Sequence, residues 1–243
     1  GRFPLIIVLS AAFFAFTGSF LDSIIPALSI TLIVFVGVSA TLAVSYLLSK
    51  TLLKGVPSTF TLELPPYRAP QVGRIIYTSI IDRTVFVLLR AAAVAAPAGA
   101  VTWLLANIYV GELSILIHAA NFLEPLGRAI GLDGFILIAF IAGFPANEIV
   151  MPVLLMAYMS TGALTDYESI DSLRQILMSN GWTILTAINV MLFSLLHWPC
   201  STTLLTIKKE TGSLKWTFAA FIIPTGIAFI VCFVTTAVYR IIW

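Results

Sequence analysis

The fold is decided by the stretch Gly143-Phe144-Pro145-Ala146-Asn147-Glu148, which puts a proline and an acid inside a long apolar run. A second stretch, His197-Trp198-Pro199-Cys200-Ser201-Thr202-Thr203, likewise puts a proline beside metal-capable side chains, here a histidine and a cysteine, between two further apolar runs. Proline has no backbone N–H, so a helix that contains it leaves one carbonyl group without a donor. Lipid tolerates such a group only where it faces protein, water or a bound solute. Both stretches therefore predict broken membrane helices that border a polar space.

The composition of the surrounding chain is that of a membrane protein. Of the 243 residues, 60% are hydrophobic and 10% are charged, and the mean hydropathy is +1.05. An ordinary soluble domain needs a more highly charged exterior than this. The net charge of +2 is too small, and too confined to loops, to indicate a nucleic-acid partner. The lipid bilayer is the partner that this composition predicts.

The apolar runs predict an all-α fold, a polytopic membrane helix bundle forming a single transmembrane domain over residues 1–243. Paired broken helices near mid-membrane are typical of a transporter's substrate site, so we expect the chain to be the pathway-bearing part of a transporter. The segment 113–130 is apolar but short, and it is expected to be re-entrant, interfacial or spanning. Six runs are long enough to cross a bilayer, at approximately 4–21, 24–49, 84–109, 134–160, 182–207 and 216–239.

The main polar loop joins the second of these runs to the third. Its middle, Glu63-Leu64-Pro65-Pro66-Tyr67-Arg68, contains two prolines, which predict extended rather than helical backbone. Residues 71–83 are amphipathic and are expected to lie at the membrane interface. The basic residues of the loop put it on the cytoplasmic side, whereas the topology of 113–181 stays open.

Cys200 is the first candidate for ion binding. A thiolate is a soft ligand, and His197, three positions earlier, could present nitrogen to the same ion from a neighbouring turn. A carbonyl freed by Pro199 could serve as a further ligand. The competing interpretation is a buried cysteine that only fills space in the core. That role is the expected one for Cys232, which lies in an apolar run, and a disulfide framework is not expected.

Glu148 is the second candidate. An ionised carboxylate at the bilayer centre costs several kcal/mol, roughly 2.5–3.5 on insertion scales for comparable charged residues, and such a side chain normally faces a polar cavity. Asn147 offers an amide oxygen beside it, and Met151 offers a thioether one turn further on. The competing interpretation is a structural ion pair, for example with Arg90, or a protonated acid. His118 is expected to be an interfacial or packing residue.

No motif predicts catalysis. The sequence has no hydrolase constellation, no GxGxxG and no GxxxxGK[ST] phosphate loop, so we expect a transport module rather than an enzyme.

Several motifs taken in order resemble the ferrous iron transport protein B (FeoB) family. They are the Glu63–Arg68 stretch, the 143–148 and 197–203 stretches, and Thr206-Ile207-Lys208-Lys209-Glu210-Thr211-Gly212. The resemblance covers essentially the whole chain and corresponds to the C-terminal half of that family's membrane domain. It implies that the chain is the second gate half, a gate-like half-transporter with broken, proline-interrupted helices. The start of the chain at Gly1 fits this reading, because it suggests a fragment of a longer polypeptide.

The resemblance implies a multi-pass protein of the bacterial inner membrane that imports Fe²⁺ as its substrate. Glu148 falls on the acidic position of the second gate motif, and Cys200 falls on the cysteine of the Pro-Cys motif. With Asn147 and His197, these are the expected metal residues. The implied partners are an N-terminal membrane half and a GTPase domain of the same parent, with a homo-oligomer possible. GTP and Mg²⁺ would act only through that domain.

Two alternatives stay open. The chain could be the membrane domain of a nucleoside-like organic-solute transporter, in which Asn147 and Glu148 would hydrogen-bond a ribose or base. It could also be a structural scaffold whose prolines serve only as packing kinks.

Overall fold

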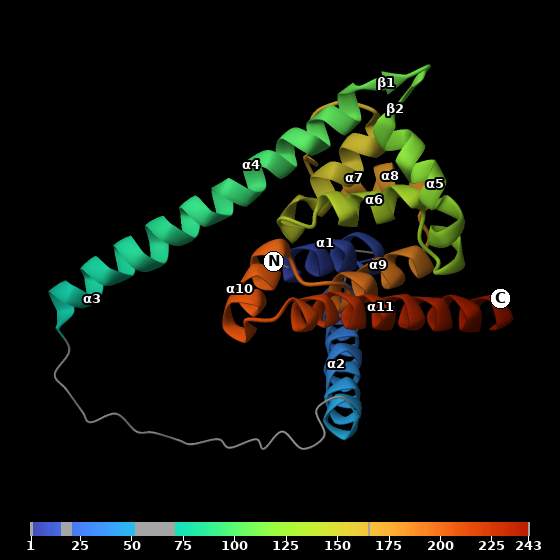
Figure 1. Cartoon of the computed structure of the whole chain (residues 1–243). Coiled ribbons are helices and arrows are strands. Elements are labelled where there is room, and N and C mark those ends of the chain that lie inside the picture. Colours follow the sequence, from blue (N-terminus) through green and yellow to red (C-terminus); the bar gives the residue numbers. More distant parts are fainter. Residues whose placement is uncertain (1, 16–20, 52–70, 165, 243) are drawn as a thin grey trace.

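The computed structural model describes residues 2–15, 21–51, 71–164 and 166–242. Over these residues the chain is almost entirely helical, with one short antiparallel hairpin (Figure 1). This confirms the predicted all-α fold. The elements in order are α1 (Phe3–Phe14), α2 (Leu21–Lys50), α3 (Val72–Thr78), the π-helical η1 (Ser79–Val85), α4 (Phe86–Asn107), β1 (Tyr109–Val110), β2 (Leu113–Ser114), α5 (Ile115–Ala129), α6 (Gly134–Ala142), the 3₁₀ turn η2 (Asn147–Ile149), α7 (Val150–Met159), α8 (Ile170–Ser179), α9 (Ile184–Leu196), α10 (Ser201–Thr211) and α11 (Leu214–Ile242).

Three stretches of the described chain are long and apolar enough to cross a membrane. They are Ile24–Lys50 in α2, Ile184–Thr211 through α9 and α10, and Leu214–Ile242 in α11. A fourth span exists if α5 and α6 are counted together, although the two helices are bent by 111° at the turn between them. The chain is therefore a multi-pass membrane protein.

The core of the molecule lies where α6, α7 and α9 pack with α1. Phe140 on α6 and Phe193 on α9 are both fully buried, and their ring centroids are 4.9 Å apart. Leu9 on α1 and Leu155 on α7 are equally inaccessible. In Figure 1, α1 lies between α6 and the pair formed by α9 and α11. The segments with Pro145 and Pro199 follow directly on α6 and α9, two helices of this core.

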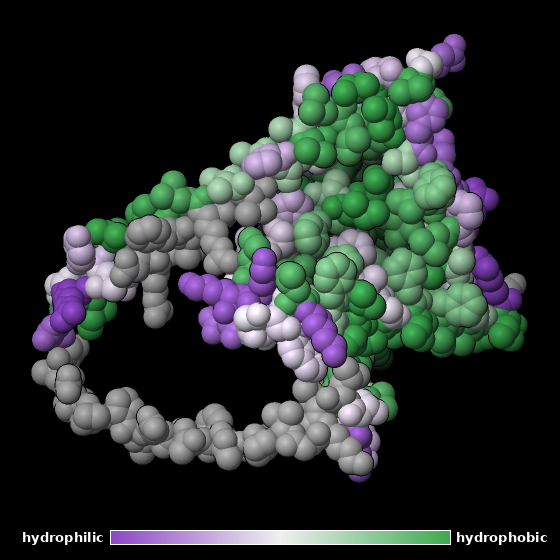
Figure 2. All heavy atoms as spheres, viewed as in Figure 1, coloured by the Kyte–Doolittle hydropathy of each residue, from purple (hydrophilic) through white to green (hydrophobic). Residues whose placement is uncertain are grey.

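The outer helices expose apolar side chains. In the most apolar stretch of α2, only 11% of the residues are buried within the chain, and the share is the same in α11. Leu32 and Phe35 on α2 are about two-thirds or more exposed, as are Phe218 and Ile230 on α11. Hydrophobic residues cover much of the face shown in Figure 2. Such surfaces are stable in lipid and would aggregate in water.

The sharp turn between α5 and α6 has a local cause. The Asp133 carboxylate accepts a hydrogen bond from Ile136 N (2.6 Å), and the Glu124 carboxylate accepts one from Gly134 N (2.7 Å). These carboxylates cap the free N–H groups at the start of α6. A Cβ atom on Gly134 would lie 1.8 Å from the Ala120 carbonyl oxygen, so only glycine allows the two helices to approach this closely.

Some expected elements differ in length or lie outside the described residues. The run expected at 4–21 begins as α1, which ends at Phe14, while residues 16–20 and 63–68 lie outside the described part of the chain. Twelve helical residues cover about 18 Å, less than the ~30 Å of a hydrocarbon core. The open segment 113–130 contains β2 and α5. Its bend into α6 fits a broken span or a re-entrant loop equally well.

Candidate functional site

The first break lies inside the run expected at 134–160. Helix α6 ends at Ala142, and Gly143 N closes it by donating to the Ala139 carbonyl (2.8 Å). The chain is extended at Ala146 before η2 starts and leads into α7. Pro145 lies between the two helical pieces, as the sequence predicts, because its ring and missing N–H prevent a continuous helix.

The second break lies between α9 and α10. Helix α9 ends at Leu196, and the backbone is extended at His197 and at Cys200, the residue that precedes α10. Pro199 is in this non-helical segment. Both predicted breaks are therefore observed at their prolines.

The two breaks are joined by a hydrogen bond. Ser201 N, the first N–H of α10, donates to the carbonyl oxygen of Phe144 at 3.0 Å. Phe144 directly precedes Pro145, so the end of one broken helix satisfies the start of the other. The structure thus brings residues 143–148 and 197–203 together.

A cavity of about 620 Å³ opens between the breaks. Cys200, Glu148 and Asn147 all line it, as do Thr202 and Thr203. Among the described residues, no three His, Cys, Asp or Glu side chains gather in one place as a closed metal site would require. The cavity thus offers a few mixed donors rather than a complete ligand set. Its other lining residues are Arg2, Phe3, Pro145, Ala146, Leu195 and Pro199.

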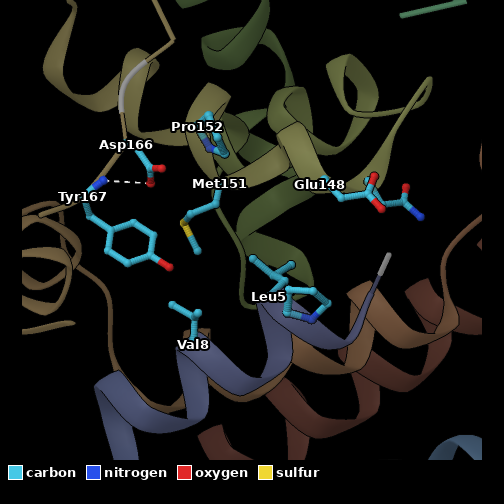
Figure 3. A pocket seen from close by; sticks show the side chains of 9 residues that line it. Leu5, Val8, Glu148, Met151, Pro152, Asp166 and Tyr167 are labelled. Atoms are coloured by element: carbon cyan, nitrogen blue, oxygen red, sulfur yellow. Dashed lines mark hydrogen bonds between the residues drawn. The ribbon is translucent and has the colours of Figure 1, made fainter. Parts of the chain in front are cut away.

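A second cavity of about 200 Å³ lies between α1 and the start of α7. Asn147 and Glu148 line both cavities. Figure 3 shows Met151 directing its thioether into this space, with Glu148 at one end and Asp166 beside Tyr167 at the other. The Asp166 carboxylate accepts a hydrogen bond from Tyr167 N (2.9 Å). Carboxylates therefore lie at both ends of the smaller cavity.

The thiol of Cys200 lies among hydroxyl groups. Its Sγ atom is 3.1 Å from Thr202 Oγ1 and 3.1 Å from Thr203 Oγ1. The residue is half-buried, in contrast to Cys232, whose thiol is fully buried and donates to the Asn189 carbonyl (3.5 Å). The two threonines stood in the second motif, but their role beside the thiol was not predicted.

Glu148 and Asn147 lie at the start of the 3₁₀ turn that leads into α7. Glu148 is exposed, and its pairing with Arg90 is not described because the side chain of Arg90 lies outside the described atoms. The Asn147 Oδ1 atom is buried and has no hydrogen-bond partner in the described structure. An acceptor of this kind beside two cavities is suited to a donor or a cation.

His197 has a different environment from Cys200. It is 1% exposed and packs against the rings of Phe140, Phe193 and Trp198. Its Nδ1 atom lies 3.0 Å and 2.9 Å from the carbonyl oxygens of Phe193 and Ser194, so Nδ1 is the donor. In the described structure, His197 lines a separate cavity of about 490 Å³ and is not among the residues around the Cys200 cavity. The extended backbone between the two residues removes the helical spacing that would have brought them together.

Arg2 is a site residue that was not predicted. Its guanidinium donates to the carbonyl oxygens of Leu195, His197 (3.1 Å) and Trp198 (3.0 Å), and it lines the Cys200 cavity. The carbonyls near Pro199 were expected as possible ion ligands, but in this structure the arginine binds three of them. The exposed His118 has its Nε2 atom 3.1 Å from the Val110 carbonyl oxygen of the hairpin.

Two protein-family models match the chain. The model for the ferrous iron transport protein B C terminus matches residues 30–82. The Gate model, described as nucleoside recognition, matches residues 88–214, which is more than half of the chain.

Curated relatives carry one name, Fe(2+) transporter FeoB. The protein from Leptospira biflexa is 25% identical and that from Leptospira interrogans 26%, each over 99% of this chain and 37% of the relative. The protein from Staphylococcus aureus strain MSSA476 is 30% identical over 82% of this chain and 29% of the relative.

The chain thus spans about a third of the length of the curated relatives it matches. No solved structure gives a significant match. The chain belongs to the Gate family and corresponds to the C-terminal part of the FeoB membrane domain.

Proposed function

We propose that this chain forms part of the path for ferrous iron through the membrane, with Cys200, Glu148 and Asn147 contacting the ion between the two broken helices. The observation that carries the proposal is the cavity that all three residues line where the breaks meet. The name Fe(2+) transporter FeoB, which relatives aligned over 99% of the chain carry, supports Fe²⁺ as the substrate. The GTPase domain, GTP and Mg²⁺ remain part of the proposal for the parent protein only.

The donor set suits an ion that must leave again. Fe²⁺ accepts sulfur, nitrogen and oxygen ligands and stands low in the affinity order of divalent metals. One thiol, one carboxylate and one amide oxygen, completed by water or the hydroxyls of Thr202 and Thr203, would hold it without trapping it. Conduction requires binding that is strong enough to admit the ion and weak enough to release it.

The smaller cavity is the place to which we propose the ion moves after it leaves Cys200. Because Glu148 and Asn147 line both spaces, an ion held near Cys200 could pass by way of these two residues toward the Met151 thioether. Asp166 at the far end would attract cations by its charge.

The test is iron accumulation in cells that express the full-length parent at matched membrane levels. Cys200→Ser is nearly isosteric and removes only the soft ligand, so we expect uptake to fall sharply while the protein stays folded. Cys232→Ser is the matched control, because a serine hydroxyl can keep the hydrogen bond to the Asn189 carbonyl. Normal uptake by Cys200→Ser, or loss of uptake only in Cys232→Ser, would contradict the site assignment.

The description of the Gate model supports a second candidate, an organic solute such as a nucleoside. In that case Asn147 and Glu148 would hydrogen-bond the solute and Cys200 would be incidental. Nucleoside binding without metal that is unaffected by Cys200→Ser would favour this candidate. Metal binding that is lost in Cys200→Ser would favour iron.

A further inference from the structure

We infer that Arg2 is a positioning residue for Cys200. Its guanidinium bonds to the carbonyl groups of Leu195, His197 and Trp198, which lie on both sides of the end of α9. These partners are 193 to 196 positions away in the sequence. The inference extends the proposed function, since it concerns the residue that holds the Pro199-Cys200 segment in place.

The carbonyl groups at the end of α9 show why an arginine is needed there. A helix end leaves its last four carbonyls without intrahelical donors, and lipid supplies none. The Phe193 carbonyl accepts His197 N (2.8 Å), and the carbonyls of Phe193 and Ser194 face His197 Nδ1. The Leu195 carbonyl is the next in line, and Arg2 is its donor.

Arg2 also binds beyond the helix, in the extended segment. Trp198 directly precedes Pro199, and its carbonyl accepts from the same guanidinium nitrogen as that of His197. Five N–H groups in a rigid planar fork can hold several acceptors at once, which a lysine ammonium on a flexible stem cannot reproduce. The segment is thereby fixed only one residue away from Cys200.

The consequence is an oriented thiol. Only Pro199 separates Cys200 from the fixed segment. On its other side Cys200 precedes α10, which Ser201 N ties to the Phe144 carbonyl. With the backbone held on both sides, Cys200 faces the same cavity as Glu148 and Arg2. Without the arginine, the carbonyls would turn toward water and the segment would gain freedom.

The experiment compares Arg2→Lys and Arg2→Gln with the full-length parent in lipid nanodiscs. The first readout is the rate at which a maleimide labels Cys200, followed on the Cys200 peptide by mass spectrometry at an alkaline pH where the thiol is ionised. We expect both variants to label several-fold faster than the parent. The second readout is the binding of Co²⁺, followed by the absorption band that a thiolate ligand gives the bound ion. Only the part of this absorption that Cys200→Ser removes is counted as binding at Cys200. Arg2→Lys keeps the charge and loses the fork, and we expect its affinity to fall by about tenfold or more.

The matched control is Arg240→Gln. Arg240 likewise donates to a backbone carbonyl, that of Arg128 (2.7 Å), at another helix end. It should leave both readouts unchanged. If Arg2→Lys does not fold, phenylglyoxal modification of Arg2 in the folded parent, with its extent measured by mass spectrometry, should produce the same faster labelling of Cys200.

The inference is overturned if Arg2→Lys matches the parent in labelling rate, whether or not Arg2→Gln differs, because charge alone would then account for any effect. It is also overturned if Arg240→Gln changes the labelling of Cys200 as much as Arg2→Lys does. A parent whose Co²⁺ binding is insensitive to Cys200→Ser would contradict the proposed function instead, and the labelling rates would still test Arg2.

Discussion

Two cysteines in this chain show how surroundings decide the role of a side chain. Cys232 is fully buried, and its thiol donates to the backbone carbonyl of Asn189. Cys200 is half-buried, lies beside two hydroxyl groups and lines a cavity with a carboxylate. A cysteine in a polar, partly accessible environment can act as a ligand, whereas a buried one behaves as a small apolar residue.

A buried polar network gives a stability prediction at the same scale. Tyr158 donates to the Asp133 carboxylate and accepts from Trp182 Nε1 (2.8 Å), and Trp182 is buried. Tyr158→Phe removes the hydrogen bonds to Asp133 Oδ2 and Trp182 Nε1 and should destabilise the protein by about 1–3 kcal/mol. Thermal unfolding of the purified protein in detergent measures the effect.

Tyr109→Phe is the control for that measurement. Tyr109 lies in the hairpin with its side chain exposed, so the change should have little effect on stability. Equal unfolding temperatures for Tyr158→Phe and the parent would contradict a structural role for the network.

The sequence could nominate only part of the candidate site. Cys200, Glu148 and Asn147 were identifiable because ligand-type side chains next to a proline are unusual in an apolar run. His197 is also a ligand-type side chain near a proline. Its burial among three aromatic rings, however, depends on helices that the local sequence does not specify. Arg2 was not identifiable because its acceptors lie almost two hundred residues away and are backbone atoms, which carry no sequence signal.

At the scale of elements, the prolines of the two motifs predicted where helices break. Other prolines, such as Pro97 in α4 and Pro224 in α11, lie inside continuous helices, and not every break has a proline. Helices α6 and α7 separate at Pro145, and α9 and α10 separate at Pro199. The 111° bend between α5 and α6 depends instead on side-chain caps and on Gly134. Hydropathy alone showed one ambiguous segment there, because the periodicity of a short apolar run does not distinguish a span from a re-entrant pair.

The bend predicts that Gly134 cannot be replaced. In Gly134→Ala the new methyl group would overlap the backbone of α5, which cannot move aside as a side chain could. We expect the free energy of unfolding to fall by about 1–3 kcal/mol or more. Gly99→Ala is the control, because a Cβ atom there meets nothing within 4 Å and alanine favours a helix by about 1 kcal/mol. Unfolding of both variants in detergent is the measurement, and a Gly134→Ala protein as stable as the parent would contradict the close approach.

At the scale of the whole molecule, exposed apolar helices surround a core that carries the breaks. The side chain of Leu32, near the middle of α2, is 67% exposed in the described structure. We expect a spin label at Leu32→Cys to be relaxed by oxygen, which dissolves in the bilayer, more strongly than by a water-soluble nickel chelate. A label at Glu210→Cys, on the exposed polar end of α10, should show the opposite preference. The same preference at both positions would contradict the assignment of α2 to the membrane.

The central claim is that the two breaks form one site, so that Cys200 and Glu148 contact the same ion. A double-mutant cycle on Fe²⁺ uptake by the full-length parent tests this most directly, with Cys200→Ser, Glu148→Gln and the double variant compared at matched membrane levels. Residues that share a partner are not additive, whereas independent sites add within about 0.3–0.5 kcal/mol. We predict that the double variant is little worse than the more damaging single variant. Losses that add fully in free energy would show that the two residues act separately and would contradict a single shared site.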